Sequence, residues 1–172
     1  AKELVTQIPH LQRVVTCTTR EKREGEQDGK DYFFLSEEMF QNKIKSQEFL
    51  EWAKVHQHYY GTLKNTLDGI TAHGDIPLLV IEVQGHATWK QLMPHALSIF
   101  IQPESMEVLR KWLTARHKDT AEDIKLRLHN AQGELARALE YDYRVVNRDG
   151  RIQETVQEIQ RIIEVNTRKL TP

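Results

Sequence analysis

The stretch Ile76-Pro77-Leu78-Leu79-Val80-Ile81-Glu82-Val83 decides the fold class, because it contains the longest apolar run of the chain. Glu82 alone interrupts this run, and Gly85 follows it. A near-continuous apolar segment is typical of a strand that is buried on both faces of a parallel sheet. It is far shorter than the roughly 18 apolar residues of a membrane span, so we expect no membrane-spanning segment. The stretch therefore predicts an α/β protein with this segment as a strand of a parallel sheet.

Downstream of this strand, helices and strands alternate. We predict a helix from Gly85 to about Met93, strand 97–101, helix 105–116, a long helix over 120–139, strand 143–147 and a final helix over 152–165. This order favours an open α/β sheet with right-handed crossover connections.

Upstream, the elements are shorter and of mixed type. We predict a helix over 1–8, strands at 14–18 and 32–35, a helix over 36–45, paired antiparallel strands at 49–55 and 58–62, and a helix over 63–72 that Gly74 ends. The first helix has no capping residue before Ala1. We expect it to continue upstream of Ala1, the alternative being a frayed natural terminus.

Composition narrows the class of protein. The 172 residues predict about one domain. With 24 basic and 25 acidic residues the net charge is −1, which argues against a generally basic nucleic-acid-binding surface but leaves room for local anion sites. The first residues do not show the basic, apolar and small-residue pattern of an export signal, and Cys17 is the single cysteine. We therefore expect a cytoplasmic protein in which Cys17 is a small buried hydrophobic residue.

The first candidate site is the charged, glycine-containing segment 19–30. Arg20 and Arg23 lie three residues apart, and Tyr32 follows shortly after. Two guanidinium groups and a phenol can converge on one phosphate, with Glu26 holding one arginine in place. A solvated charged loop is an equally good interpretation of the spacing alone.

The second candidate is Glu51, which has two apolar residues on either side in Phe49-Leu50-Glu51-Trp52-Ala53. Alternation along a strand predicts that Phe49, Glu51 and Ala53 share one face. A carboxylate is costly to bury there unless a partner donates a hydrogen bond to it. The alternative is an edge-strand carboxylate paired with a lysine.

Three weaker signals accompany these candidates. Tyr60 and Thr62 flank a glycine, an arrangement that packing explains as often as binding. The basic run that contains Arg116 and Arg127 fits either a lid over polyphosphate or an exposed helix face. His56 and His58 could form half of a metal site, but no cysteine or third histidine completes the set, so we predict no metal-binding residues.

Together these motifs, in this order, resemble those of guanylate kinases, the enzymes that move a phosphoryl group from ATP to GMP. The similarity runs from about Thr16 to Asn147. The matching stretches are 18–26 (TTREKREGE), 28–32 (DGKDY), 49–53 (FLEWA), 60–62 (YGT), 83–85 (VQG), 99–101 (IFI), 127–128 (RL) and 141–147 (YDYRVVN).

The resemblance implies an α/β fold with a parallel-sheet core like that of P-loop NTPases, an inserted small mixed or antiparallel subdomain that binds GMP, and a helical lid. Within one domain over 1–172, the core would comprise 1–18, 74–116 and 128–172, the GMP-binding subdomain 19–73 and the lid 117–127. It further implies ATP and GMP as ligands, Mg²⁺ bound with ATP, and a monomer or homodimer.

The resemblance also implies roles for individual residues. Those at positions that bind the GMP phosphate are Arg20, Arg23, Tyr32 and Tyr60, with Glu26 orienting the arginine pair. Those at positions that read guanine are Thr16, Glu51 and Thr62. Glu82 stands where the family usually has aspartate in an Asp-x-Gln-Gly segment. Arg116 and Arg127 match catalytic lid arginines, and Asn147 matches a residue beside the adenine of ATP.

Several positions depart from the family pattern. No G-x-x-x-x-G-K-[ST] phosphate loop occurs in the chain, and we expect it upstream of Ala1. Val80 replaces a common acid near the metal, Trp112 a lid arginine, and His117 a glycine. The alternative function is an inactive guanylate kinase-like module that binds phosphorylated peptides. The missing loop favours that module, whereas Glu51 and the two lid arginines favour the enzyme.

Overall fold

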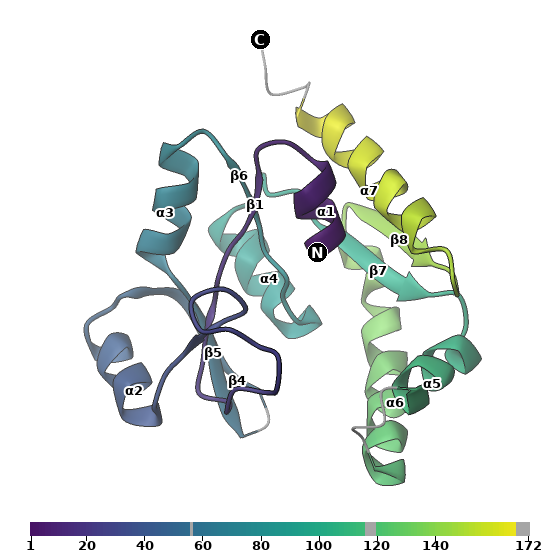
Figure 1. Cartoon of the computed structure of the whole chain (residues 1–172), viewed down its shortest axis with the longest axis horizontal. Helices are drawn as coiled ribbons and strands as arrows, with labels where there is room; N and C mark the ends of the chain where they lie inside the picture. Colours follow the sequence, from purple (N-terminus) through teal and green to yellow (C-terminus); the bar gives the residue numbers. More distant parts are fainter. Residues whose placement is uncertain (56, 116–119, 168–172) are drawn as a thin grey trace. The chain divides into compact units, whose positions relative to one another are not determined.

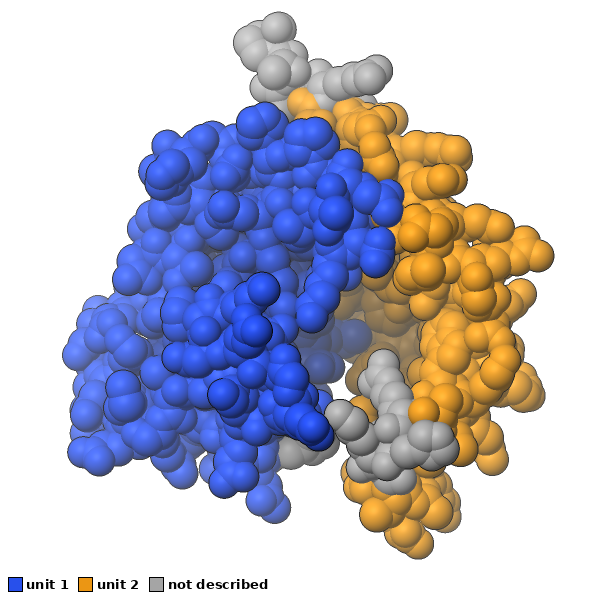
Figure 2. Space-filling model, viewed as in Figure 1, with its two compact units in different colours: residues 1–92 blue, residues 93–172 orange. Residues whose placement is uncertain are grey.

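A computed structural model describes residues 1–55, 57–115 and 120–167 of the chain. They belong to two units, Ala1–Leu92 and Met93–Pro172, which Figure 2 shows in blue and orange. The first unit contains a mixed sheet, a short parallel strand pair and four helices, and the second contains a parallel strand pair with its helices (Figure 1).

The mixed sheet of the first unit has the strand order β3-β2-β5-β4. Its strands are β2 (Cys17–Thr18), β3 (Phe33–Phe34), β4 (Phe49–Val55) and β5 (His58–Leu63). β5 runs antiparallel to both β2 and β4, whereas β2 and β3 are parallel. The predicted antiparallel pair is thus confirmed, and β2, which was predicted as part of a core strand, lies in this sheet.

Helix α2 (Glu37–Lys45) covers one face of the mixed sheet. The helix begins as predicted at Ser36, whose Oγ accepts a hydrogen bond of 3.1 Å from the Met39 amide. Phe40 of α2 is fully buried and stacks on Phe49, with ring centroids 4.4 Å apart. Cys17 belongs to the same apolar cluster, as expected, and burial raises the pKa of its thiol to about 11. This face of the sheet is therefore core.

The parallel pair of the first unit joins β1 (Leu11–Arg13) to β6 (Ile76–Leu78). Helices α1 (Lys2–Gln7), α3 (Lys64–Ala72) and α4 (Val83–Leu92) complete this unit. The predicted strand over 14–18 is wrong in extent, because the chain leaves β1 after Arg13 and enters the mixed sheet only at Cys17. Residues 14–16 therefore connect strands of two different sheets, which a β-branched run alone does not reveal.

Strand β6 is shorter than its apolar sequence predicts. It ends at Leu78, and Val80 and Ile81 are 59% and 37% exposed. Burial on both faces is therefore wrong for this segment. Among the described residues β6 pairs only with β1, whose ladder also ends at Leu78, so nothing extends the strand further.

The second unit has a regular parallel pair, β7 (Ile99–Pro103) and β8 (Tyr143–Asn147), in register over their full lengths. Its helices are α5 (Met106–Ala115), α6 (Ala121–Ala136), the 3₁₀ turn η1 (Ala138–Glu140) and α7 (Ile152–Thr167). Thr120 and Asp123 cap each other reciprocally at the start of α6. All these elements lie within a few residues of their predicted positions.

The predicted fold class is confirmed. Both strand pairs are parallel and their strands are connected through helices, and the mixed sheet is inserted in the sequence between β1 and β6. No helix among the described residues combines the length and the apolar character that crossing a membrane requires.

Candidate functional site

The face of the mixed sheet opposite α2 carries polar side chains. Residues paired across neighbouring strands lie on the same face, and the register pairs Thr18 with Tyr60 and Glu51 with Thr62. Thr18 and Thr62 are fully buried. This surface, which we call the polar sheet face, thus collects three residues that the sequence singled out, Glu51, Tyr60 and Thr62.

A bulge in β4 determines where Glu51 points. Phe49 pairs with Leu63, but Glu51 pairs with Thr62, so the register shifts between Phe49 and Glu51. The extra residue places Phe49 in the core and Glu51 on the opposite face. The prediction that these two residues share a face is therefore wrong, since strict alternation does not hold through a bulge.

Gly61, in the neighbouring strand β5, leaves the space that the bulge in β4 occupies. A Cβ atom on Gly61 would lie 2.9 Å from the Phe49 ring, 3.0 Å from the carbonyl oxygen of Glu51 and 3.0 Å from the Cβ of Trp52. Such distances are too short for carbon contacts. Only glycine therefore allows β4 to lie this close to β5.

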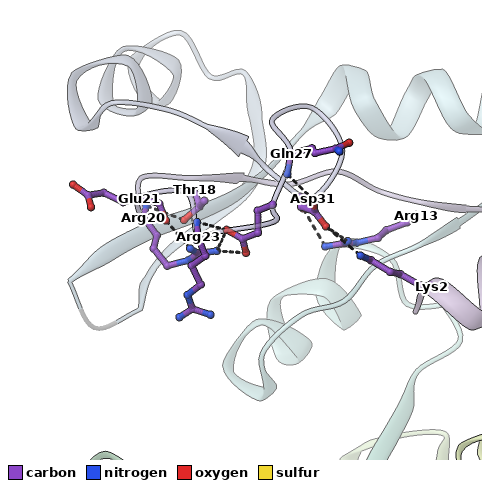
Figure 3. A network of polar contacts seen from close by, with 9 residues as sticks. Lys2, Arg13, Thr18, Arg20, Glu21, Arg23, Gln27 and Asp31 are labelled. Carbon is purple, nitrogen blue, oxygen red and sulfur yellow. Dashed lines mark hydrogen bonds and ion pairs between the residues drawn. The ribbon is translucent and has the colours of Figure 1, made fainter. Parts of the chain in front are cut away.

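At one end of the polar sheet face, Arg20 is held by Glu26. The Nη2 of Arg20 donates to both carboxylate oxygens, at 2.8 and 3.1 Å, and Arg23 donates its backbone N–H to Oε2 at 2.8 Å. Figure 3 shows both arginines in this network. The hydrogen bond from Arg20, and then that from the Arg23 amide, lower the pKa of Glu26. Glu26 thus fixes the Arg20 side chain and the Arg23 backbone.

The guanidinium group of Arg23 is not fixed in this way. It has no hydrogen-bond or ion-pair partner among the described residues, and it extends away from the loop in Figure 3. The charged segment 19–30, which we call the Arg20 loop, therefore combines one restrained cation with one that remains available to a ligand.

Aromatic rings surround the restrained arginine. The guanidinium carbon of Arg20 lies 5.6 Å from the centre of the Tyr32 ring and 5.8 Å from that of Phe34. Tyr32 in turn meets Tyr60 edge to face, with centroids 6.2 Å apart. The structure thus brings Arg20, Tyr32 and Tyr60 together, as their joint assignment to one phosphate requires.

The sequence did not identify Arg13 as part of this region. Its guanidinium carbon also lies 5.8 Å from the Tyr32 ring, and its Nη2 donates to the carbonyl oxygen of Asp31 at 3.1 Å (Figure 3). Arg13 belongs to β1, so only the tertiary fold brings it near Tyr32. No local signal identifies it, because β1 consists of Leu11, Gln12 and Arg13 and is not an apolar strand.

At the other end, Glu51 has a hydroxyl partner instead of a cation. Thr62 donates its Oγ1–H to the Oε1 of Glu51 at 2.9 Å. Burial raises the pKa of the Glu51 carboxyl, while the Thr62 hydroxyl and the Trp89 indole oppose this shift. β4 is an edge strand, but among the described residues no lysine pairs with Glu51. The lysine-paired alternative is therefore not what the structure shows.

A hollow of about 500 Å³ opens beside the Arg20 loop. It is lined by Thr19, Arg20, Glu21, Glu37, Gln57 and His58. Neither Glu51 nor Tyr32 belongs to its lining, so this hollow does not coincide with the cluster on the polar sheet face.

The remaining candidates of the first unit lie apart from these contacts. Thr16 precedes β2, and its carbonyl oxygen accepts a hydrogen bond of 2.9 Å from the Phe33 amide. Glu82 is exposed between β6 and α4, and its side chain makes no hydrogen bond or ion pair within the described ranges. Val80, also exposed, offers no ligand atom in its side chain.

The second unit carries the other candidates. Arg127 lies on α6, and Asn147 ends β8, where its Oδ1 accepts a hydrogen bond of 3.0 Å from Thr155. Trp112 donates its Nε1–H to Asp149 at 2.8 Å. The predicted catalytic residue Arg116, together with His117 and His56, falls outside the residues that the structure describes.

Comparison with known proteins agrees with this geometry. The family model of guanylate kinase matches residues 1–166. The guanylate kinase of Symbiobacterium thermophilum is 39% identical over 162 residues, which cover 94% of this chain and 76% of that protein. That of Thermotoga maritima is 37% identical over 170 residues, covering 99% and 81%.

A solved structure supports the same assignment. The crystal structure of guanylate kinase from Anaplasma phagocytophilum matches with a TM-score of 0.77 and 32% sequence identity, over 95% of this chain and 78% of that chain. The family match spans both units and includes every residue of the polar sheet face. The chain therefore belongs to the guanylate kinase family and is a nucleoside monophosphate kinase.

Proposed function

We propose that the chain binds GMP on the polar sheet face and transfers to it the γ-phosphoryl group of ATP, giving ADP and GDP. One observation carries the proposal. The same sheet face has arginine and tyrosine side chains at one end and, at the other, a half-buried carboxyl without a cation partner among the described residues. A nucleotide has the matching asymmetry, with an anionic phosphate and a base that donates hydrogen bonds.

The phosphate would bind at the Arg20 end. Guanidinium groups match phosphate oxygens in geometry, and charge-assisted hydrogen bonds of this kind contribute about 1.5–3 kcal/mol each. Arg20 is already oriented by Glu26, and Arg23 supplies a second guanidinium group. Tyr32 and Tyr60 add phenolic donors from the same side.

Guanine would bind at the Glu51 end. Its N1–H and 2-amino groups donate hydrogen bonds, and an ionised Glu51 accepts them. Adenine has an acceptor at N1 and no 2-amino group, so it would leave the carboxylate desolvated and unpaired, at a cost of about 1–3 kcal/mol. Thr62 holds the Oε1 of Glu51, and we assign Thr16 and Glu82 to the surroundings of the base.

Phosphoryl transfer itself requires positioning and positive charge more than covalent chemistry from the protein. We assign Arg116 and Arg127 to the transferred phosphoryl group and Asn147 to the adenine of ATP. Among the described residues no three histidine, cysteine or acidic side chains form a metal site, and Val80 supplies no oxygen ligand. These residues do not fit a resident Mg²⁺ ion, so we propose that Mg²⁺ enters on the phosphates of ATP.

Binding of GMP by the Glu51→Gln variant tests the base assignment. We expect a GMP affinity at least tenfold lower by isothermal titration calorimetry, because the amide presents an N–H group to a base that donates. Glu48→Gln is the matched control, since Glu48 precedes β4 and pairs with Lys43 at 2.7 Å. An unchanged GMP affinity in Glu51→Gln would contradict the proposal. Displacement of GMP by a phosphorylated peptide would favour the binding module instead.

A further inference from the structure

Trp89 is a buried donor whose hydrogen-bonding capacity is unused. The residue lies on α4 and is 5% exposed, yet its Nε1–H makes no hydrogen bond with any described residue. Leaving a buried donor unsatisfied destabilises the folded state. Such groups are uncommon in native proteins, and each one requires an explanation.

The candidate acceptor for this donor is the carboxyl of Glu51. Helix α4 packs on β4, the strand that carries Glu51. The indole of Trp89 favours the charged form of that carboxyl and thereby lowers its pKa, although no hydrogen bond of ordinary geometry forms. The unused donor and this acceptor therefore lie on two elements that pack together.

The acceptor capacity of a carboxylate leaves room for Trp89. An ionised carboxylate offers about four lone-pair positions. Thr62 uses one of these at 2.9 Å, and the N1–H and amino groups of guanine would use two more. One position remains, and the donors that act on it are the Thr62 backbone N–H and the Trp89 indole N–H, which can only donate.

We propose that Trp89 is a positioning residue for Glu51, and that its indole N–H completes the hydrogen bonding of this carboxylate when guanine is bound. The inference rests on the proposed function and adds a residue that orients the base-reading group. Trp89 would hold the carboxylate ionised and in one orientation, and so strengthen discrimination in favour of guanine.

Two elements pack against the strand of Glu51. Thr62 and Tyr60 share its face from β5, and His86 and Lys90 lie on α4 with Trp89. None of the charged groups that the structure describes contributes to the pKa shift of Glu51. Of these residues, His86 could be mistaken for Glu51 in a pH titration, and it is retained when Glu51 is replaced.

The first test uses the wild-type chain without ligand. The indole ¹H–¹⁵N signal of Trp89 is followed by NMR from pH 3 to 8 and assigned by elimination with Trp52→Phe and Trp112→Phe. We expect it to titrate above pH 4.5, with Glu51, and the titration to disappear in Glu51→Gln. The indole signal of Trp112 is an internal reference. Its hydrogen-bond partner is Asp149, whose pKa is lowered by the hydrogen bonds from Lys111 and Trp112. A Trp89 signal that is flat, or that titrates identically in Glu51→Gln, would overturn the inference.

The second test compares two tryptophan substitutions. We expect Trp89→Phe to bind GMP about fivefold to tenfold more weakly than wild type, the effect of one hydrogen bond, with a loss that increases toward low pH. Trp52→Phe, which alters a half-exposed ring, should stay within about twofold. Equal GMP affinity of Trp89→Phe and wild type at every pH would also overturn the inference.

If wild type fails to bind GMP, the proposed function is wrong, whereas the NMR titration still decides the coupling. The NMR titration of the wild-type chain also decides the coupling between Trp89 and Glu51 if Trp89→Phe does not fold.

Discussion

Glu26 and Glu51 are both glutamates of the same unit, and their surroundings shift their pKa values in opposite directions. Glu26 accepts hydrogen bonds from the Arg20 guanidinium and the Arg23 amide, which lower its pKa. Glu51 accepts one from the Thr62 hydroxyl and is more deeply buried, so its pKa is raised. The difference is that Glu26 has a cation partner and Glu51 has none among the described residues.

This contrast separates two tasks within one site. The charge of Glu26 is satisfied within the protein, so Glu26 can orient Arg20 but has little capacity left for a ligand. The charge of Glu51 is only partly compensated, which makes the ionised form unfavourable until a hydrogen-bond donor arrives. The carboxyl that destabilises the empty site is therefore the one suited to recognise a base.

Replacement of Gly61 by alanine should have the largest effect and should break the Glu51 end. The new Cβ would lie 3.0 Å from the Glu51 carbonyl oxygen and 2.9 Å from the Phe49 ring, so β4 must move away from β5. We expect a loss of about 2–3 kcal/mol in the free energy of unfolding, measured by urea denaturation. GMP affinity should fall by more than tenfold, because the bulge that directs Glu51 would be displaced.

Gly69→Ala is the matched control for this substitution. Gly69 lies in α3, and a Cβ there would meet nothing within 4 Å. Alanine in a helix is favoured over glycine by about 0.5–1 kcal/mol, so this variant should be slightly more stable than wild type. Equal stability of the two alanine variants would show that the β4–β5 spacing is not what fixes Glu51.

The secondary structure of this site could be predicted from sequence, but the direction of its key side chain could not. Strand 49–55, strand 58–62 and the Ser36 cap follow from apolar pattern and capping chemistry, both of which act over a few residues. The bulge after Phe49 reverses the face of Glu51, and it depends on Gly61 in another strand. Alternation therefore predicted a strand but assigned Glu51 to the wrong face.

The contacts that require tertiary structure were also missed. Arg13 lies near Tyr32, and the helix that carries Trp89 packs on the strand that carries Glu51, although these elements are distant in sequence. By contrast, Arg20, Glu26 and Arg23 interact within one short loop, and the sequence identified them together. Local interactions could be predicted, whereas those between strands and helices needed the structure.

Glu26→Gln should have an intermediate effect and acts on the other end of the comparison. Arg20 would lose its charged partner while only 13% of its side chain is exposed. We expect a loss of about 1–2 kcal/mol in stability at pH 7, less than for a fully buried pair because Glu26 still contacts solvent. The difference from wild type should vanish as the pH falls through the lowered pKa of Glu26, as measured by urea denaturation. Glu154→Gln, which removes an exposed pair with Arg151, should change stability by no more than about 0.5 kcal/mol.

The smallest effect, with the opposite sign, is expected for the stability of Glu51→Gln. Because the folded-state pKa of Glu51 is raised, the native protein binds more protons than the unfolded chain from about pH 4.5 up to that pKa, and wild-type stability falls as the pH rises through this window. The variant lacks this titration, so its stability relative to wild type should increase with pH and level off above the pKa of Glu51. We expect a gain of up to about 1 kcal/mol near pH 7, the scale of one hydrogen-bonding group, in urea denaturation without ligand.

Glu48→Gln, which removes an exposed ion pair with Lys43, should show no such increase with pH. If Glu51→Gln were instead less stable than wild type at pH 7, the carboxylate would be stabilising the empty site, and the contrast with Glu26 would not hold.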